Sequence, residues 1–354
     1  MKRNKVIDFL TVTLFFGILL SFMIYTGIET LMQYERNGAV SIGEQKGGFN
    51  SMFYEDENLD GFVKSFDYRV FGQTGSADLI VGKDDWLFEV RDTQSGYERL
   101  LDYIGGNQFD DKQLERAHKK ITDDKKFCED NGAKYVLVVV PDAITVCSDK
   151  VPSYLGLQSE NTRRAQLNRY LAGVSESAFV DPTQSMIEAN EQLCTYNNTE
   201  NSINAYGAYV IYEGVMRELD GYAQRGVVPI AREDVEFFTR LTDGKSVAVR
   251  AGLDKTVKNR TVSLTDKMEY DYKVVGSSKG AILTRMNVAS NDMRVIVECA
   301  DDWDRTQLTP YFSNTFYEVV YTSGEDGTRA VLQKDGADIV IRLVHEGELG
   351  YIAK

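Results

Sequence analysis

The first pattern along the chain is a long apolar stretch near the N-terminus. Residues 9–28 contain no charged side chain, and Lys2, Arg3 and Lys5 precede them. A helix of this length spans about 30 Å, the thickness of the hydrocarbon core of a bilayer, and positive charge before such a span stays in the cytoplasm. We therefore expect residues 1–28 to form a cytoplasmic tail and a transmembrane signal anchor, with the rest of the chain outside the cytoplasm. A cleaved signal peptide and a buried core helix are the alternative interpretations.

Beyond this stretch, amphipathic segments alternate with short, continuous apolar runs. Residues 111–131 have apolar positions at helical spacing, and Gly132 follows in the usual C-cap position. Residues 135–140 (YVLVVV) are apolar without interruption, which is typical of a strand covered on both faces. The same patterns predict a hairpin over 77–90, helices over 162–173 and 207–222, and strands at 179–182, 295–297, 316–322 and 337–344. Alternation of this kind predicts an α/β fold with a mainly parallel sheet flanked by helices.

Two regions depart from the alternation. Residues 29–75 are polar, and we interpret them as a stalk that leads into the folded domain. Residues 226–290 contain short alternating segments separated by polar turns, which predict a smaller lobe inserted over the sheet. The main domain is therefore expected to comprise residues 76–354.

The composition narrows the possible functions. The 354 residues include 54 Asp and Glu against 40 Lys and Arg, a formal net charge of −14. This balance argues against non-specific nucleic-acid binding, which requires a basic face. The 4 cysteines contain no C-x-x-C pair, so we expect no thiolate zinc site, and both disulfides and free core thiols remain open. No cofactor is expected.

One acidic segment resembles the beginning of a calcium-binding loop. Asp56, Asn58 and Asp60 alternate before Gly61, and Asp67 follows at the last ligand position of such a loop. Oxygen ligands at alternate positions and a glycine for the sharp turn are what this loop requires. An ordinary acidic turn is the alternative, and no other metal site is predicted here.

Four short blocks, taken together and in order, resemble the SGNH-hydrolase-like domain of the alginate O-acetyltransferase and DHHW family. They are residues 81–88 (VGKDDWLF), 138–142 (VVVPD) with 151–152, 196–212, and 294–297 with 310–312. The resemblance covers residues 75–350 and implies an SGNH-like fold. It also implies acetyl transfer to polysaccharide hydroxyls outside the membrane, by a Ser that a His deprotonates and an Asp orients.

The residue types that perform this chemistry are missing from the matching positions. Counted from Gly207, the family's Asp falls on Glu200 and its His on Ser202. The nucleophile block falls at Asp301 and Asp302, and residues 295–311 contain no Ser. Loss of both nucleophile and base removes nearly all covalent catalysis, so we interpret the motifs as degenerate.

Several residues near these blocks are further candidates. The acidic run of Asp301, Asp302 and Asp304 is either a polar loop at a strand end or an acid–base or metal group. Neither histidine, His118 or His345, lies at a motif position, and we expect both to be solvated or to cap an element. The candidate binding residues are Asn204, Tyr209 and Trp303. Aromatic faces stack on sugars, although ordinary packing is the alternative for them.

The sequence as a whole predicts a single-pass membrane protein with an extracytoplasmic domain. Its predicted role is to bind a glycan or a partner during O-acetylation of cell-surface polysaccharide, and whether it is an enzyme stays open. Its partners would be the polysaccharide and, by resemblance, a multi-spanning membrane O-acyltransferase. The alternatives are an active O-acetyltransferase or esterase with a non-standard site, and a surface structural or adhesion protein.

Overall fold

The computed structural model describes residues 57–91, 99–172, 179–265, 270–278 and 281–354, together with positions 13, 16, 17 and 20. Contacts divide the chain into two units, residues 1–60 and 61–354, and the second unit contains the site described below. The predicted membrane segment, residues 9–28, lies almost wholly outside the described residues. Within the described residues, no helix combines the length and the apolar character needed to cross a bilayer.

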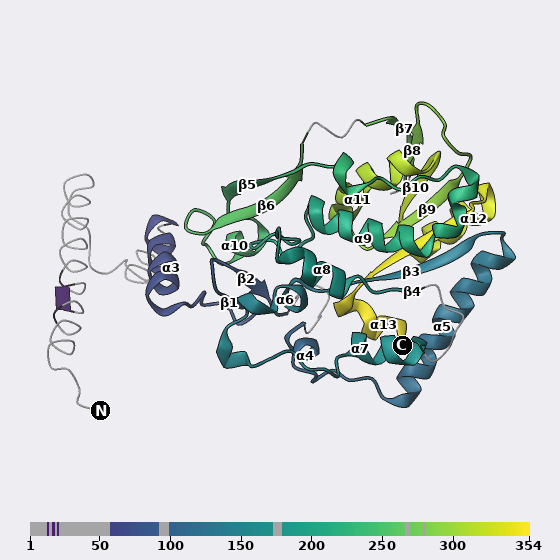
Figure 1. Ribbon diagram of the computed structural model, residues 1–354. Helices are drawn as coiled ribbons and strands as arrows, with labels where there is room; N and C mark the ends of the chain where they lie inside the picture. Colours follow the sequence, from purple (N-terminus) through teal and green to yellow (C-terminus); the bar gives the residue numbers. More distant parts are fainter. Residues whose placement is uncertain are drawn as a thin grey trace, which may run out of the picture. The chain divides into compact units, whose positions relative to one another are not determined.

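A seven-stranded sheet forms the centre of the second unit (Figure 1). Its strands, in spatial order, are β4 (Phe179–Val180), β3 (Lys134–Val140), β11 (Ile339–His345), β9 (Arg294–Cys299), β10 (Glu318–Ser323), β8 (Ala281–Met286) and β7 (Tyr272–Ser278). The first five strands are parallel, and β8 and β7 are antiparallel to their neighbours. The prediction of an α/β fold with a mainly parallel sheet is therefore confirmed.

Helices cover both faces of this sheet, because its central strands are apolar on both sides. One face carries α5 (Asp111–Asp130), α7 (Arg163–Ala172), α12 (Glu325–Asp335) and α13 (Leu349–Ile352). The other carries α6 (Ala143–Val146), α8 (Thr183–Asn190), α9 (Ala205–Glu218) and α11 (Asp302–Thr315). Along β3, Val136 and Val138 join the core under α9, whereas Leu137 and Val139 join the core under α5. This alternation follows from the two-residue period of a strand.

Before the sheet, a short hairpin holds the first block of the family resemblance. It pairs β1 (Leu79–Val81) with β2 (Leu87–Glu89) in antiparallel register. Asp84 and Asp85 adopt positive φ angles in its turn, and Trp86 and Phe88 are fully buried. Helix α4 (Arg99–Tyr103) follows. The predicted hairpin is confirmed.

The inserted lobe is smaller than predicted. Strands β5 (Phe237–Asp243) and β6 (Lys258–Leu264) form a separate antiparallel ribbon, joined by the short helix α10 (Ser246–Arg250). By contrast, β7 and β8 extend the central sheet, because β8 pairs with β10. An alternating pattern predicts a strand but does not specify its partner, so the sequence could not distinguish a lobe strand from an edge strand.

The predicted calcium loop is not formed. Asn58, Asp60 and Asp67 lie on helix α3 (Glu57–Phe71), and Asp56 lies outside the described residues. A calcium loop has to curl around the ion, whereas the backbone is helical over Glu57–Phe71.

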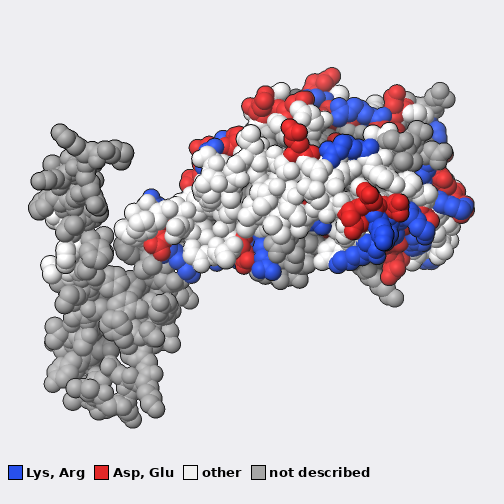
Figure 2. Space-filling view, turned by 90° about the horizontal axis from the view of Figure 1, so that it is seen from below, with Lys and Arg blue, Asp and Glu red and all other residues white. Residues whose placement is uncertain are grey.

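The surface of the second unit is mixed in charge. Helix α5 carries the pairs Lys119–Asp123 and Lys126–Asp130, at 3.0 and 2.9 Å, between side chains one turn apart. On the face that Figure 2 shows, acidic and basic side chains are intermixed and not separated by sign.

Candidate functional site

The polar residues of the site gather at the carboxyl ends of the central strands. Asp142 follows β3, Glu346 follows β11, and Asp301 follows β9. Because these strands are neighbours and parallel, their ends meet at one edge of the sheet. This edge is where open α/β sheets bind their ligands.

The block that contains Glu200 and Ser202 forms a tight, largely buried loop before α9. Tyr196 pairs with Ile203 across it, and the Asn197 amide donates to the Ser202 carbonyl at 2.9 Å. Asn204 is fully buried and caps α9, since its side chain accepts hydrogen bonds from the amides of Tyr206 and Gly207. The structure thus places Asn204, a candidate binding residue, in a helix cap.

The two halves of the family motif meet in space. The Trp303 indole donates to the Ile203 carbonyl at 2.7 Å, and the Tyr311 hydroxyl donates to the Ala205 carbonyl at 2.5 Å. These two contacts join α11 to the last residues before α9 and to the first residue of α9. Trp303 keeps 37% of its surface exposed, so it also borders solvent.

The motif positions themselves hold Glu200, Ser202 and Asp302. Burial raises the pKa of Glu200, although Lys245 acts in the opposite direction. The Ser202 hydroxyl accepts a hydrogen bond from the Asn197 side chain at 3.1 Å. Asp302 is 84% exposed and pairs with Arg305 at 2.7 Å. No hydrogen bond joins these three motif residues to one another in the part of the chain that the structure describes.

Two further predicted residues have packing or capping roles. Tyr209 is buried in an aromatic cluster with Tyr311 and Phe237, and its hydroxyl donates to the Ile230 carbonyl at 3.2 Å. Asp301 is the N-cap of α11 and accepts from the Asp304 amide at 2.8 Å. Partial desolvation and the Asp304 charge raise the pKa of Asp301.

The most notable pair at this edge was not predicted from the sequence. His345 Nε2 lies 2.7 Å from Asp304 Oδ2, and the exposed fractions of the two side chains are 25% and 1%. Burial alone would lower the pKa of His345, but the charge and hydrogen bond of Asp304 outweigh it and raise that pKa to about 10. The contact with Asp304 therefore favours the imidazolium form of His345. The sequence could not predict this pair, because His345 and Asp304 are 41 residues apart. The only sequence signal for His345 was its position at the end of an apolar run.

The other histidine lies far from this pair in the fold. His118 is half-buried on α5, where its ring contacts Tyr170 and lies 3.4 Å from the Thr122 hydroxyl. All four cysteines are free, and three of them are buried, as expected of core thiols. Burial raises the pKa of Cys299, at the end of β9, well above its ordinary value, so this thiol is not a nucleophile.

A network of ion pairs lies beside the ends of the central strands. Glu346 accepts from the Asp142 amide at 3.0 Å and pairs with Arg164 at 3.1 Å, and Arg164 also pairs with Asp181 at 2.6 Å. Arg99 pairs with Asp142 at 3.4 Å. Burial raises the pKa of both Asp142 and Glu346. Each acidic side chain of this network thus has an arginine partner, and these pairs hold the strand ends in place.

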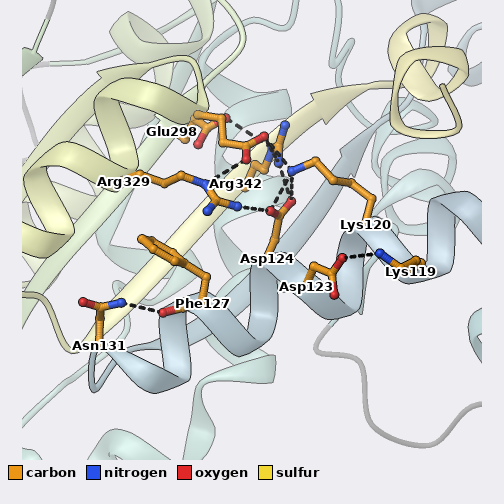
Figure 3. Close-up of polar contacts among 10 residues, drawn as sticks. Lys119, Lys120, Asp123, Asp124, Phe127, Asn131, Glu298, Arg329 and Arg342 are labelled. Atoms are coloured by element: carbon orange, nitrogen blue, oxygen red, sulfur yellow. Dashed lines mark hydrogen bonds and ion pairs between the residues drawn. The ribbon is translucent and has the colours of Figure 1, made fainter.

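A second charged cluster lies on the α5 and α12 side of the sheet (Figure 3). Asp124 is contacted by Lys120, Arg329 and Arg342, at 2.6, 2.7 and 2.8 Å. A cavity of about 350 Å³ adjoins it and includes Glu298 in its lining. The charges of this cluster are paired with one another, so it binds its own elements together.

Comparison with solved structures identifies the fold. Bacillus cereus PatB1, solved with a sulfonyl adduct, matches 77% of this chain and 95% of its own length, with a TM-score of 0.53 and 13% identity. A DHHW family protein from Eubacterium siraeum matches 70% of this chain and 89% of its own, with a TM-score of 0.51 and 11% identity. The O-acetyltransferase domain of Pseudomonas putida AlgJ aligns with a TM-score of 0.43 and 14% identity, over 77% of this chain and 92% of its own. No family model matches the sequence, and no curated protein matches it.

The structural matches define the fold of this protein. Its second unit shares the fold of PatB1 and of the DHHW family protein, in agreement with the fold that the four sequence blocks implied. At this level of identity, the matches establish the fold and leave the chemistry to be argued from the residues.

Proposed function

We propose that this chain is a membrane-anchored, extracytoplasmic component of cell-surface polysaccharide O-acetylation that binds a glycan or a partner and does not itself carry the acetyl group. The observation behind this proposal is the contact between Trp303 and Ile203. It brings the two motif halves together, yet their catalytic positions hold Glu200, Ser202 and Asp302.

This set of side chains lacks a route to covalent acyl transfer. A hydroxyl becomes a useful nucleophile only when a base lies against it. Ser202 has an amide as its neighbour, and amides do not take protons at neutral pH. Pairing with Asp304 raises the pKa of His345 to about 10, and no hydrogen bond among the described residues joins His345 to Ser202.

The same edge of the sheet is suited to binding a glycan. Trp303 offers an exposed aromatic face beside the half-buried Glu200 loop, and aromatic faces stack on the CH groups of sugars. By the family resemblance, the donor of acetyl groups would be a multi-spanning membrane O-acyltransferase, with residues 9–28 holding this chain beside it.

One alternative has a specific observation in its favour. The raised pKa of Glu200 is a feature of catalytic acids and bases, so an active esterase or acetyltransferase with a rebuilt site is the second candidate. Wild-type turnover that is lost in Glu200→Gln would support it and contradict the binding proposal.

The proposal is tested by rebuilding the motif. We expect wild-type full chain, purified in detergent, to form no acetyl adduct with an activated acetyl ester, as read by intact-protein mass spectrometry. In the double variant Ser202→His with Asp302→Ser, a His and a Ser return to the positions that the family resemblance assigns to them, each next to a residue of the contact between Trp303 and Ile203. We expect ester hydrolysis to rise about 10²-fold over the parent, the range of general-base catalysis. Asp302→Ser alone, which has no base, is the matched control.

A further inference from the structure

We propose that Asp301, Asp304 and His345 form a binding site for a divalent first-row transition-metal ion of the zinc class. This inference does not depend on the proposed function, because it is argued from the positions of three side chains and not from the missing Ser and His of the motif.

The geometry of the three side chains suits a single ion. One ligand atom from each residue lies within 4.8 Å of the others, and the closest two, His345 Nε2 and Asp304 Oδ2, are 2.7 Å apart. Ligand atoms at about 2.1 Å from a tetrahedral ion lie about 3.4 Å from one another. Small side-chain adjustments therefore bring all three to one ion, which would take the place of the proton between His345 and Asp304.

The backbone holds the ligands in place. Asp301 and Asp304 are fixed at the first turn of α11 by their cap hydrogen bond, and His345 ends β11, the strand beside β9. The cap uses Oδ1 of Asp301, and a carboxylate has a second oxygen, so capping and metal binding are compatible. Asp301 is exposed while Asp304 is buried, so an ion could enter from solvent.

The charges around Asp301 and Asp304 differ from those around the other acidic groups of the two charged clusters described above. Asp142 and Asp181 each pair with an arginine, and Asp124 pairs with three cations. Among the ion pairs of the described residues, none joins a lysine or arginine to Asp301 or Asp304. Two carboxylates thus share one imidazole, which leaves a net negative charge even when the ring is protonated.

The chemistry of the ligand atoms limits which metal ions can bind. One imidazole nitrogen with two carboxylate oxygens is a ligand set that zinc accepts, and manganese and iron accept similar sets. Three protein ligands leave a fourth position for water or a ligand, as in open zinc sites.

The test measures zinc binding to the full chain in detergent after removal of metals by a chelator. We expect one tight equivalent of Zn²⁺ by calorimetry and by metal analysis. Asp301→Asn should weaken binding at least tenfold, because it removes a charged ligand, yet asparagine caps helices as well as aspartate does. Asp302→Asn makes the same charge change one residue away and should leave the affinity unchanged.

Three results would overturn the proposal: no stoichiometric zinc binding to wild type, equal zinc binding in wild type and Asp301→Asn, or an equal loss in Asp302→Asn. Zinc held by the free thiols would survive Asp301→Asn and so gives the second of these results. Co²⁺ in place of Zn²⁺ provides an independent readout, since a bound tetrahedral ion should show visible absorption that Asp301→Asn loses.

Discussion

At the scale of single residues, the site is defined by how each buried charge is compensated. Asp304 is almost fully buried, and its ionic partner is His345 at 2.7 Å. Removing one member of a buried pair leaves the other without compensation, which costs more than the pair itself contributes. Asp302, two residues away, is exposed, so removing it leaves no buried charge without a partner.

The first prediction follows from this contrast. In metal-free buffer, Asp304→Ala should lower the free energy of unfolding by about 3–5 kcal/mol, as measured by urea denaturation. Asp302→Ala should change it by no more than about 0.5 kcal/mol. The double variant of Asp304→Ala with His345→Ala should cost less than the sum of the single changes. Strict additivity in this cycle would mean that the two side chains are not coupled.

At the scale of elements, the beginning of α9 positions one half of the motif. Asn204 caps the helix, and Gly207 lets its first turn approach the loop that contains Thr195. A methyl group on Gly207 would lie well inside the van der Waals distance of the Thr195 carbonyl oxygen. The glycine is needed here for close approach, since its φ angle is not positive.

We therefore expect Gly207→Ala to destabilise the protein by about 1–3 kcal/mol, the cost of overpacking. Gly327→Ala on α12 is the matched control, because a methyl group there would meet no atom within 4 Å. It should stabilise the protein by about 0.5–1 kcal/mol through the higher helix propensity of alanine. Urea denaturation measures the change in the free energy of unfolding for both variants. Equal changes of the same sign would contradict the close approach of Gly207 to Thr195.

At the scale of the whole molecule, charged side chains join four elements that are far apart in the sequence. Figure 3 shows Asp124 of α5, Glu298 of β9, Arg329 of α12 and Arg342 of β11 in one cluster. Burial raises the pKa of Glu298, although Arg342, at 3.2 Å, acts in the opposite direction. Because the folded-state pKa lies above the ordinary value of 4.5, the protonated form is favoured by folding.

The raised pKa of Glu298 makes the stability of the protein depend on pH. The contribution of Glu298 to stability is fully present below pH 4.5 and is lost as the pH rises through the raised pKa. Glu298→Gln removes this titration, so the stability of wild type relative to the variant should fall as the pH rises above 4.5. Unfolding free energies at several pH values measure it. A constant difference, or a rise with pH, would contradict the direction of the shift.

The sequence by itself determined the alternation of elements and the order of the motif blocks. Residues 135–140 are apolar at every position, and a strand of that kind must be covered on both faces, so a layered α/β fold follows from local pattern alone. The four blocks implied the SGNH-like fold that the structural matches confirm. The sequence also predicts that the family's nucleophilic Ser and its His are missing from the positions that match the motif, and this stays a prediction.

Only the tertiary structure decided which distant residues meet. The pairing of Asp304 with His345, and of β8 with β10, joins segments more than thirty residues apart. Such contacts depend on strand order, because β11 is inserted between β3 and β9 although it is last in the chain. Local periodicity carries no information about strand order, so the sequence could predict His345 only as a solvated or capping residue. The structure makes it the N-cap of Glu346–Glu348 and, in addition, the partner of Asp304.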